Sequence, residues 1–532
     1  MKGLLSVTDH SSNAAPKEVY NWKLVSLAVS AALGSAMFGY DTGYISGTLN
    51  LPSFKAKFGL DQADGNDLAA LQSNIVSTFQ GGCFFGCMFA YVITEVFGRK
   101  FTLMLSGAVL DVGVILQLAA NGSVGMFYAG RIITGLSVGT TSMIVPIYIA
   151  EWAPPAIRGR LVGIYEAMYQ SALVVAFWVS YGVKVHQSDT SDQQWYIPVA
   201  LQMIFGTGVT LAMAFQPETY RWLIKKGKEE RAIKNICWVR NLDAEHPYIQ
   251  WELETVREQI ETERELAKDT TVLSLFKECG KKGIRFRIAL CVLVMMFQNL
   301  SGINALNYYA PDIFRSIGFK GDEVELLATG VFGIIKALTN YAFVMVGIDR
   351  FGRRKTLLTG CVGTIVAMFY LAIYTQVSGS FDKTVPKDAG AYFAIIMVYV
   401  FALFYTFSWN GVPYIYCAEI LPNRLRTLGM MFAVLTQWLF QFMVVYSNPY
   451  MMTNIKYGTF YFFGAWLIIS WFFAFYCMPE TQGLALEDMD IMFNAKGTAR
   501  TKRRKTDEVV SERRQQRDVK SDSGEHTEEV IA

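Results

Sequence analysis

The chain has 532 residues, of which 52% are hydrophobic, 14% aromatic and 17% charged, with a formal net charge of +3. One or two soluble cores could not bury that much apolar surface, so lipid must cover it and a soluble enzyme is excluded. The near-neutral charge gives no support for a nucleic-acid partner. The eight cysteines fall mostly inside apolar runs without metal-ligand spacing, so we expect buried thiols and neither a metal site nor a cofactor.

The N-terminal residues up to about Tyr20 are polar and lack the apolar core of a signal peptide, so the first apolar run should remain in the protein. Apolar runs of roughly 20 residues, the length of a membrane-spanning helix, then occur at 22–46, 72–94, 101–120, 124–150, 160–183, 194–216, 286–310, 326–349, 356–377, 390–418, 427–451 and 457–478. A hydrophilic segment at 217–285 separates six runs from six. We predict an all-α membrane protein with twelve transmembrane helices, in bundles 22–216 and 286–478. The flanking parts are an N-terminal tail (1–21), a helical linker (217–285) and a largely disordered tail (479–532).

A polar pattern is repeated in the two bundles. Phe97-Gly98-Arg99-Lys100 returns as Phe351-Gly352-Arg353-Arg354-Lys355, and the pair Glu151 and Arg158 returns as Glu419 and Arg426. Each copy lies in a short joint between apolar runs. Two pseudo-symmetric six-helix bundles are typical of secondary transporters, which bind cargo between their halves.

Arginine-rich joints all fall on the side of the membrane that carries both termini and the linker. They are Arg99-Lys100, Arg158 to Arg160, Arg350 to Lys355 and Arg424 to Arg426. The positive-inside rule makes that side cytoplasmic. The linker mixes both charge signs at helical spacing, which indicates short solvated helices under the bundle, either passive or regulatory.

Two charges in the first bundle, Asp41 and Arg131, lie within apolar runs at compatible depth. A charge near a helix centre costs about 3 kcal/mol on insertion scales, so each needs a partner or a function. We expect an ion pair. It either fixes helix packing or forms a proton site, in which protonation of Asp41 releases Arg131 and couples conformation to the proton.

Glu166 and Lys336 are a second pair of intramembrane charges, one in each bundle. They could bridge the central cavity, and the neutralised lysine would then favour a neutral cargo. A lysine free in the cavity would instead attract a carboxylate. Alternatively, both side chains reach cytoplasmic water.

The seventh apolar run is interrupted by polar residues from Gln298 to Tyr309, with the sequence QNLSGINALNYY. Amides that donate and accept hydrogen bonds, next to aromatic rings, suit a polyhydroxylated solute. Polar contacts between helices are the alternative.

With these features the chain resembles the sugar porters of the major facilitator superfamily, and most of all the fungal branch that includes quinate permeases and monosaccharide transporters. The likeness covers roughly residues 20–490. Its motifs are FGYDTG (38–43), FGRK (97–100), GRIITG (130–135), AEWAPPAIRGR (150–160), PETYRWL (217–223), QNLSGINALNYY (298–309), DRFGRR (349–354), SWNG (408–411) and PETQG (479–483).

The resemblance implies the major facilitator fold and a role for each matching residue. Asp41 and Arg131 match the proton-coupling pair, Gln298, Asn304 and Gln437 match sugar-binding amides, and Tyr308 and Tyr309 match the extracellular gate. The cytoplasmic charge network that latches the outward-facing state would comprise Arg99, Glu151, Arg158, Arg353, Glu419 and Arg426.

Several positions depart from the hexose pattern and leave the cargo open. Asn299, Tyr414 and Glu166 replace a glutamine, a tryptophan and a glutamine, Gln170 lies one turn from Glu166, and Lys336 adjoins the position of a frequent asparagine. We count all of these among the expected substrate-binding residues. The first hypothesis is proton-coupled import of a monosaccharide across the plasma membrane. The alternatives are a proton-linked permease for a carboxylated polyol such as quinate or a uronate, and a sugar sensor that transports nothing.

Overall fold

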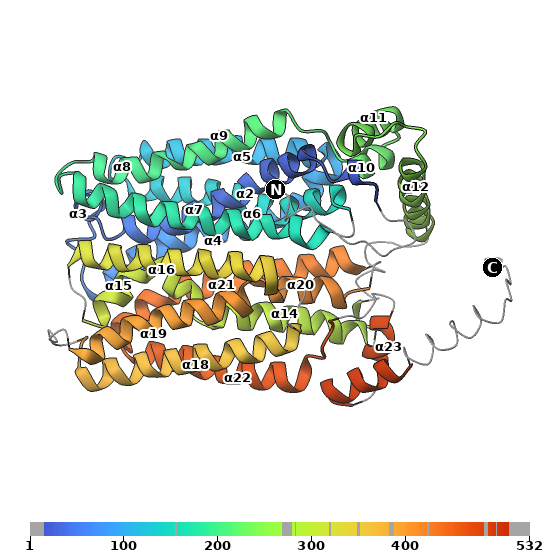
Figure 1. The fold of residues 1–532 in the computed structure, drawn as a ribbon. Helices are drawn as coiled ribbons and strands as arrows, with labels where there is room; N and C mark the ends of the chain where they lie inside the picture. Colours follow the sequence, from blue (N-terminus) through green and yellow to red (C-terminus); the bar gives the residue numbers. More distant parts are fainter. Residues whose placement is uncertain are drawn as a thin grey trace.

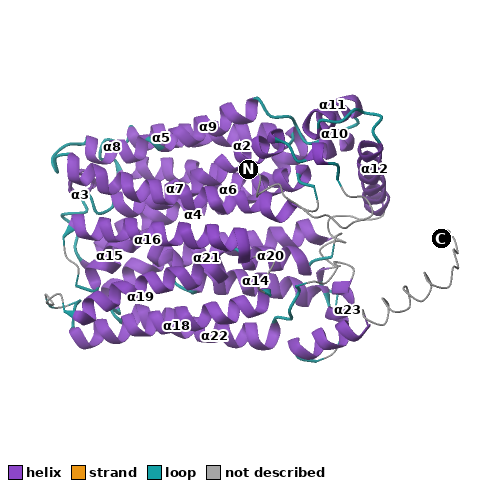
Figure 2. Ribbon diagram, in the orientation of Figure 1, coloured by secondary structure: helices purple, strands orange, loops and turns teal. Residues whose placement is uncertain are grey.

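The computed structural model describes residues 15–154, 157–268, 279–281, 283–318, 321–347, 352–381, 383, 388–422, 425–482, 488–495 and 497–509. Within these residues it is helical, without a strand (Figure 2). Twelve helical segments are long and apolar enough to cross a membrane, which confirms the predicted number.

The N-terminal half is built from six spans. They are α2 (Trp22–Thr48), α4 (Gly65–Phe97), α5 (Arg99–Leu118), α6 (Val124–Trp152), α7 (Arg158–His186) and the pair α8 (Gln193–Ala200) and α9 (Gln202–Ala214). Three shorter helices, η1 (Lys17–Val19), α10 (Tyr220–Lys225) and α11 (Glu229–Arg240), lie at one end, as does α12 (Pro247–Lys268) (Figure 1). We call this end of the molecule the linker end. The short helix α3 (Pro52–Phe58) marks the opposite end, which we call the loop end.

The C-terminal half has the same number of spans but more interruptions. Its elements are α14 (Ile284–Leu300) with α15 (Ile303–Ser316), α16 (Asp322–Ala342) with the π-helical turn η3 (Phe343–Gly347), α18 (Arg353–Ser378), α19 (Ala389–Tyr405) with the π-helical turn η4 (Thr406–Asn410) and α20 (Val412–Ile420), α21 (Arg426–Asn454), and α22 (Gly458–Cys477). The short helix α23 (Asp488–Asn494) follows at the linker end (Figure 1). In Figure 1 the two halves lie one above the other with their helices parallel to a common axis.

The predicted interruption of the seventh span is confirmed between α14 and α15. Gly302 has φ +89°, a left-handed conformation that suits glycine. A Cβ there would stand 2.8 Å from the ring of Phe463, so the site also leaves no room for a side chain. The break lets the amides on either side of it, Asn299 and Asn304, meet in a hydrogen bond.

The second span is longer than its apolar run, because it begins at Gly65, and Asn66 and Asp67 form a polar first turn that an apolar count omits. The tenth span, Ala389–Ile420, agrees with the predicted run at 390–418, and the π-helical turn Thr406–Asn410 interrupts its α-helical geometry. That turn faces the amides of α14.

Candidate functional site

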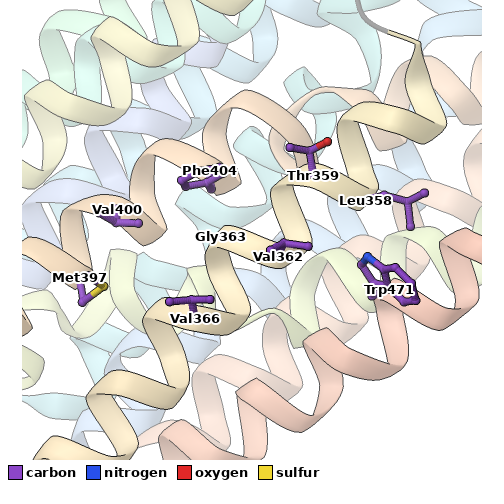
Figure 3. A pocket seen from close by; sticks show the side chains of 9 residues that line it. All are labelled: Leu358, Thr359, Val362, Gly363, Val366, Met397, Val400, Phe404 and Trp471. Atoms are coloured by element: carbon purple, nitrogen blue, oxygen red, sulfur yellow. The ribbon is translucent and has the colours of Figure 1, made fainter.

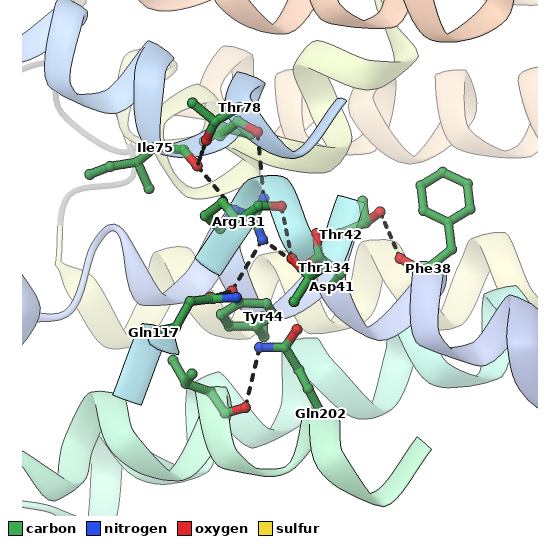
Figure 4. Close-up of polar contacts among 12 residues, drawn as sticks. Phe38, Asp41, Thr42, Tyr44, Ile75, Thr78, Gln117, Arg131, Thr134 and Gln202 are labelled. Carbon is green, nitrogen blue, oxygen red and sulfur yellow. Dashed lines mark hydrogen bonds and ion pairs between the residues drawn. The ribbon is translucent and has the colours of Figure 1, made fainter. Parts of the chain in front are cut away.

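Asp41 and Arg131 form a fully buried ion pair between α2 and α6 (Figure 4). Both side chains have 0% exposure. The Arg131 guanidinium also donates to the carbonyl oxygen of Ile75 at 3.1 Å and to the Tyr44 hydroxyl at 3.1 Å, and it stands 4.7 Å above the Phe79 ring centroid. The pair that the sequence predicted is therefore present.

The two members of this pair are held unequally. Arg131 keeps a carbonyl, a hydroxyl and an aromatic ring without Asp41, whereas Oδ2 of Asp41 is buried and has no hydrogen-bond partner among the described residues. Protonation of the carboxylate would thus remove one contact and leave the arginine positioned.

Three of the predicted amides are joined by hydrogen bonds. Asn304 donates to Oδ1 of Asn299 at 2.7 Å, and Nδ2 of Asn299 donates to Oε1 of Gln437 at 3.1 Å. The fourth, Gln298, donates through Nε2 to the carbonyl oxygens of Trp409 and Asn410 in η4, at 2.9 and 3.0 Å. The π-helical turn thus supplies carbonyls that anchor Gln298.

The predicted gate tyrosines lie between the halves. The Tyr308 hydroxyl is 3.1 Å from Thr42 Oγ1 of α2 and accepts from Gln441 at 3.2 Å, while Tyr309 donates to the Val445 carbonyl at 3.1 Å. Further hydrogen bonds between the halves join Ser73 to Tyr446, Asn66 to Asn454 and Asn50 to Arg315. These contacts close the halves against each other toward the loop end, and two more, Ser171 with Tyr341 at 2.7 Å and Trp438 with Ser142 at 3.3 Å, join the halves nearer the middle of the spans.

Several buried polar atoms between the halves have no hydrogen-bond partner among the described residues. They are Oε2 of Glu166, both side-chain polar atoms of Gln170, Oε1 of Gln298, Oδ1 of Asn340 and Nδ2 of Asn410. Buried polar groups in proteins are nearly always paired with protein or water. Both halves contribute such atoms, and the Glu166 carboxylate of the first half lies next to the Asn410 amide of the second.

Aromatic hydroxyls surround Glu166. Tyr165, Tyr169, Tyr405 and Tyr414 lie within electrostatic range of its carboxylate. Tyr414 thus lies beside the other expected binding residues. Among the described residues, no group of His, Cys, Asp and Glu side chains could hold a metal ion.

Glu166 and Lys336 lie within electrostatic range of each other but form no ion pair within 4 Å. Gly163 packs against Val344 and Gly333 against Phe177, so α7 and α16 run antiparallel. This register places the backbones of Glu166 and Lys336 at levels that differ by roughly 10 Å. The bridge proposed from the sequence is therefore not formed. Lys336 is instead buried, with 1% exposure, and donates to Oδ1 of Asn307 at 2.7 Å.

The repeated polar motifs form matching ion pairs at the linker end. Nη2 of Arg99 is 3.0 Å from Oε1 of Glu151, and Nη2 of Arg353 is 2.8 Å from Oε1 of Glu419. Each pair lies within one half. Arg158 lies near Tyr220 and Glu252, and the side chain of Arg426 falls outside the described residues.

Two further carboxylates belong to these networks and had no predicted role. Glu218 accepts from the backbone N–H groups of Arg99 and Lys100, at 3.1 and 3.0 Å, and Glu480 accepts from those of Arg353 and Arg354, at 2.7 and 3.1 Å. Each carboxylate sits at a helix N-terminus, where anions are favoured. Burial raises the pKa of Glu218, although these backbone donors oppose that shift. The repeated Pro-Glu-Thr at 217–219 and 479–481 was the signal that could have found them.

This fold and this site define a membrane transporter with the major facilitator architecture. The chain resembles the solved proton:xylose symporter XylE bound to 6-bromo-6-deoxy-D-glucose, with 25% identity and a TM-score of 0.72 over 88% of this chain and 99% of that one. An inward-open structure of XylE from E. coli matches at a TM-score of 0.71 and 24% identity, over 88% of this chain and 99% of that one.

The family model for sugar (and other) transporters matches residues 27–493, so the chain belongs to this family of sugar porters. Its relatives include a probable quinate permease of Aspergillus fumigatus, 39% identical over 90% of this chain and 89% of the relative. The quinate permease of Emericella nidulans is 38% identical over 90% of each chain.

Proposed function

We propose that this protein couples proton entry to the uptake of a carboxylated cyclic polyol, by alternating access across the plasma membrane. The carrying observation is the buried ammonium of Lys336, whose hydrogen bond goes to a neutral amide and which has no carboxylate within 4 Å among the described residues. A buried unpaired cation is costly, and an anionic solute would neutralise it.

The opposite side of the site fits the rest of such a solute. Glu166 offers a carboxylate that accepts hydrogen bonds from hydroxyls, and Gln170 and Gln298 carry unpaired amide atoms. Because Glu166 and Lys336 lie at different levels, the ring of the cyclic polyol would lie between them. Its carboxylate would face Lys336, and its hydroxyls would face Glu166. The quinate permeases among the relatives support a solute with a carboxylate and several hydroxyls.

A monosaccharide is the second candidate, favoured by the likeness to the xylose symporter and by the neutral amide network of Asn299, Asn304 and Gln437. It was the first hypothesis from the sequence. A neutral monosaccharide carries no anionic group that could neutralise Lys336, and we therefore rank it second. A sensor that binds without transporting is the third.

We further propose that the linker end is cytoplasmic, which puts both termini there. The arginine-rich joints support this orientation, since short cytoplasmic loops carry an excess of Lys and Arg. If the linker end is cytoplasmic, the closed loop end faces outward, and the structure represents a conformation that is closed to the outside.

The test is uptake in cells that lack their own carriers, comparing quinate, galacturonate, xylose and glucose. We expect quinate or galacturonate to accumulate, and Lys336→Met to lose that uptake far more than any uptake of neutral sugar. Lys336→Arg, which keeps the charge, should retain part of it. Accumulation of neutral sugars alone, unaffected by Lys336→Met, would reject the carboxylated cargo, and absence of all uptake by a correctly located protein would favour the sensor.

A further inference from the structure

A groove on the outer face of the C-terminal half lies apart from the central site. It has a volume of about 560 Å³ and lies between α18, α19 and α22 (Figure 3). Val362 and Val366 line it and are 53% and 56% exposed, although they belong to a membrane-spanning helix. In a bilayer such a face is covered by lipid.

The exposed face of α18 changes its chemistry with depth. Lys355, Thr359, Val362 and Val366 are all exposed, and their spacing places them on one side of the helix. From the linker end they present an ammonium, a hydroxyl and then two apolar side chains. Val366 lies about 16 Å deeper than Lys355 at the helical rise, which is about half the thickness of the hydrocarbon core. The stripe therefore spans one leaflet in the order of a phospholipid: headgroup, ester region, acyl chain.

Trp471 of α22 supplies a hydrogen-bond donor at the level of the ester groups. It stands as far from the linker end of its helix, Cys477, as Thr359 stands from Arg353. Its ring is stacked on Phe475, and its indole N–H makes no hydrogen bond to another described residue. Tryptophan is enriched at the membrane interface, where its N–H can meet polar lipid groups.

Cations gather at the start of α18, one turn or less beyond the lining residues Leu358 and Thr359. Lys355 is exposed, and Arg500 of the helical segment 499–509 is also exposed and lies within electrostatic range of Arg354. The carboxylate of Glu480 is occupied by backbone N–H groups at the start of α18. An anionic headgroup would relieve the repulsion between these cations.

The N-terminal half provides an internal comparison. The repeated motif aligns Arg99 with Arg353, so the exposed positions of α5 that match Lys355 and Thr359 are Phe101 and Leu105. Both are apolar. The matching face of the first half is therefore an ordinary lipid-facing surface, and the polar stripe is particular to the second half.

A glycine keeps the groove open. A Cβ at Gly363 would lie 2.2 Å from the ring of Phe404, so any side chain there would displace this ring, which lines the groove. The matching residue of the first half is Val109. Where the first half has a branched side chain, the second half therefore has free space beside the helix.

We propose that this groove binds one anionic phospholipid of the leaflet at the linker end, with its headgroup at Lys355, its ester region at Trp471 and an acyl chain along Val362 and Val366. Phosphatidylserine is an abundant anionic phospholipid of cytoplasmic leaflets, and we take it as the occupant. The binding chemistry does not depend on the transported solute. It rests on the proposed function only for the name of the leaflet.

The test measures phosphatidylserine bound to the purified full-length protein by native mass spectrometry, with phosphatidylcholine and ergosterol as competing lipids. We expect the parent to retain phosphatidylserine. Lys355→Ala should weaken this binding about fivefold, the effect of one basic residue near an anionic surface. Val362→Trp, at an exposed position that tolerates a larger side chain, should abolish it by filling the groove. Lys226→Ala, an exposed lysine of the linker end in the other half, is the matched control and should change nothing.

Retention of phosphatidylserine by Lys355→Ala and Val362→Trp at the parental level would overturn the proposal. So would equal displacement by phosphatidylcholine, which shares the chains but not the charge, or preferential binding of ergosterol. Thermal melting of each variant verifies folding. Transport need not be measured, so failure of this proposal and failure of the proposed function are distinguishable.

Discussion

The two halves share a polar framework at the linker end and differ inside the membrane. Arg99–Glu151 and Arg353–Glu419 are matching ion pairs, at 3.0 and 2.8 Å, and Glu218 and Glu480 occupy matching helix N-termini. Deeper in the membrane, the first half holds the sealed pair Asp41–Arg131. At comparable places the second half holds amides with unpaired atoms and a broken helix.

From this difference we propose that the first half carries the proton pair, while the amides of the second half bind the solute together with Glu166 and Gln170 of the first half. A pair with 0% exposure is suited to a charge that changes, because protonation of Asp41 would remove the ion pair that joins α2 to α6 and would so alter how these helices hold together. Amides near a helix break are suited to recognition, because the break exposes polar atoms that a continuous helix would direct elsewhere. The predictions below separate these two tasks.

The largest effect should follow Asp41→Asn. Without an ionisable group at this position, the protein should lose uphill accumulation driven by an imposed pH gradient while keeping exchange of solute. Asp111→Asn is the control, because Asp111 is also an intramembrane carboxylate but pairs with Thr207 between α5 and α9, away from the site. If Asp41→Asn accumulated solute to the parental level, Asp41 in the first half would not be the proton-coupling residue.

A smaller effect is expected for Gln298→Ala and Asn304→Ala in the second half. Each substitution leaves hydrogen bonds to the solute unmade, at a cost of about 1–3 kcal/mol, which lowers binding affinity roughly tenfold or more. Coupling to the proton should persist. Binding and pH-driven accumulation are measured in the same preparation, with Gln376→Ala, an exposed amide of the same half, as the control. Loss of coupling at unchanged affinity would contradict these roles of the two halves.

The sequence alone predicted the fold and the buried ion pair Asp41–Arg131, for a clear reason. Twelve apolar runs and an intramembrane Asp41 or Arg131 are visible because hydrocarbon penalises polar groups one residue at a time. The relation between Glu166 and Lys336 was not visible, because it depends on the register of α7 against α16, which Gly163 and Gly333 set by close packing. The role of the π-helical turn at Thr406–Asn410 also escaped, since it contributes carbonyl oxygens that every residue type possesses.

The shared framework predicts equal losses of stability in the two halves. Glu218→Ala and Glu480→Ala each remove a carboxylate that accepts two backbone N–H groups at the first turn of α5 or α18, and each should cost about 1 kcal/mol, as for other helix caps. The apparent melting temperature of purified protein should fall by similar amounts in both variants. A fall confined to one of them would show that the duplicated motif has kept its structural role in that half only.

The smallest expected effect belongs to Phe101→Lys, which places on α5 the cation that α18 carries at Lys355. Charge alone should add little phosphatidylserine binding there, because Leu105 and Val109 stand where the second half has Thr359 and Gly363, so the new ammonium would have neither a polar ester region nor a groove below it. The gain measured by native mass spectrometry should therefore be well below the roughly fivefold loss expected for Lys355→Ala. A gain as large as that loss would mean that any basic residue at this depth recruits the lipid. The asymmetry between the halves would then be one of charge and not of shape.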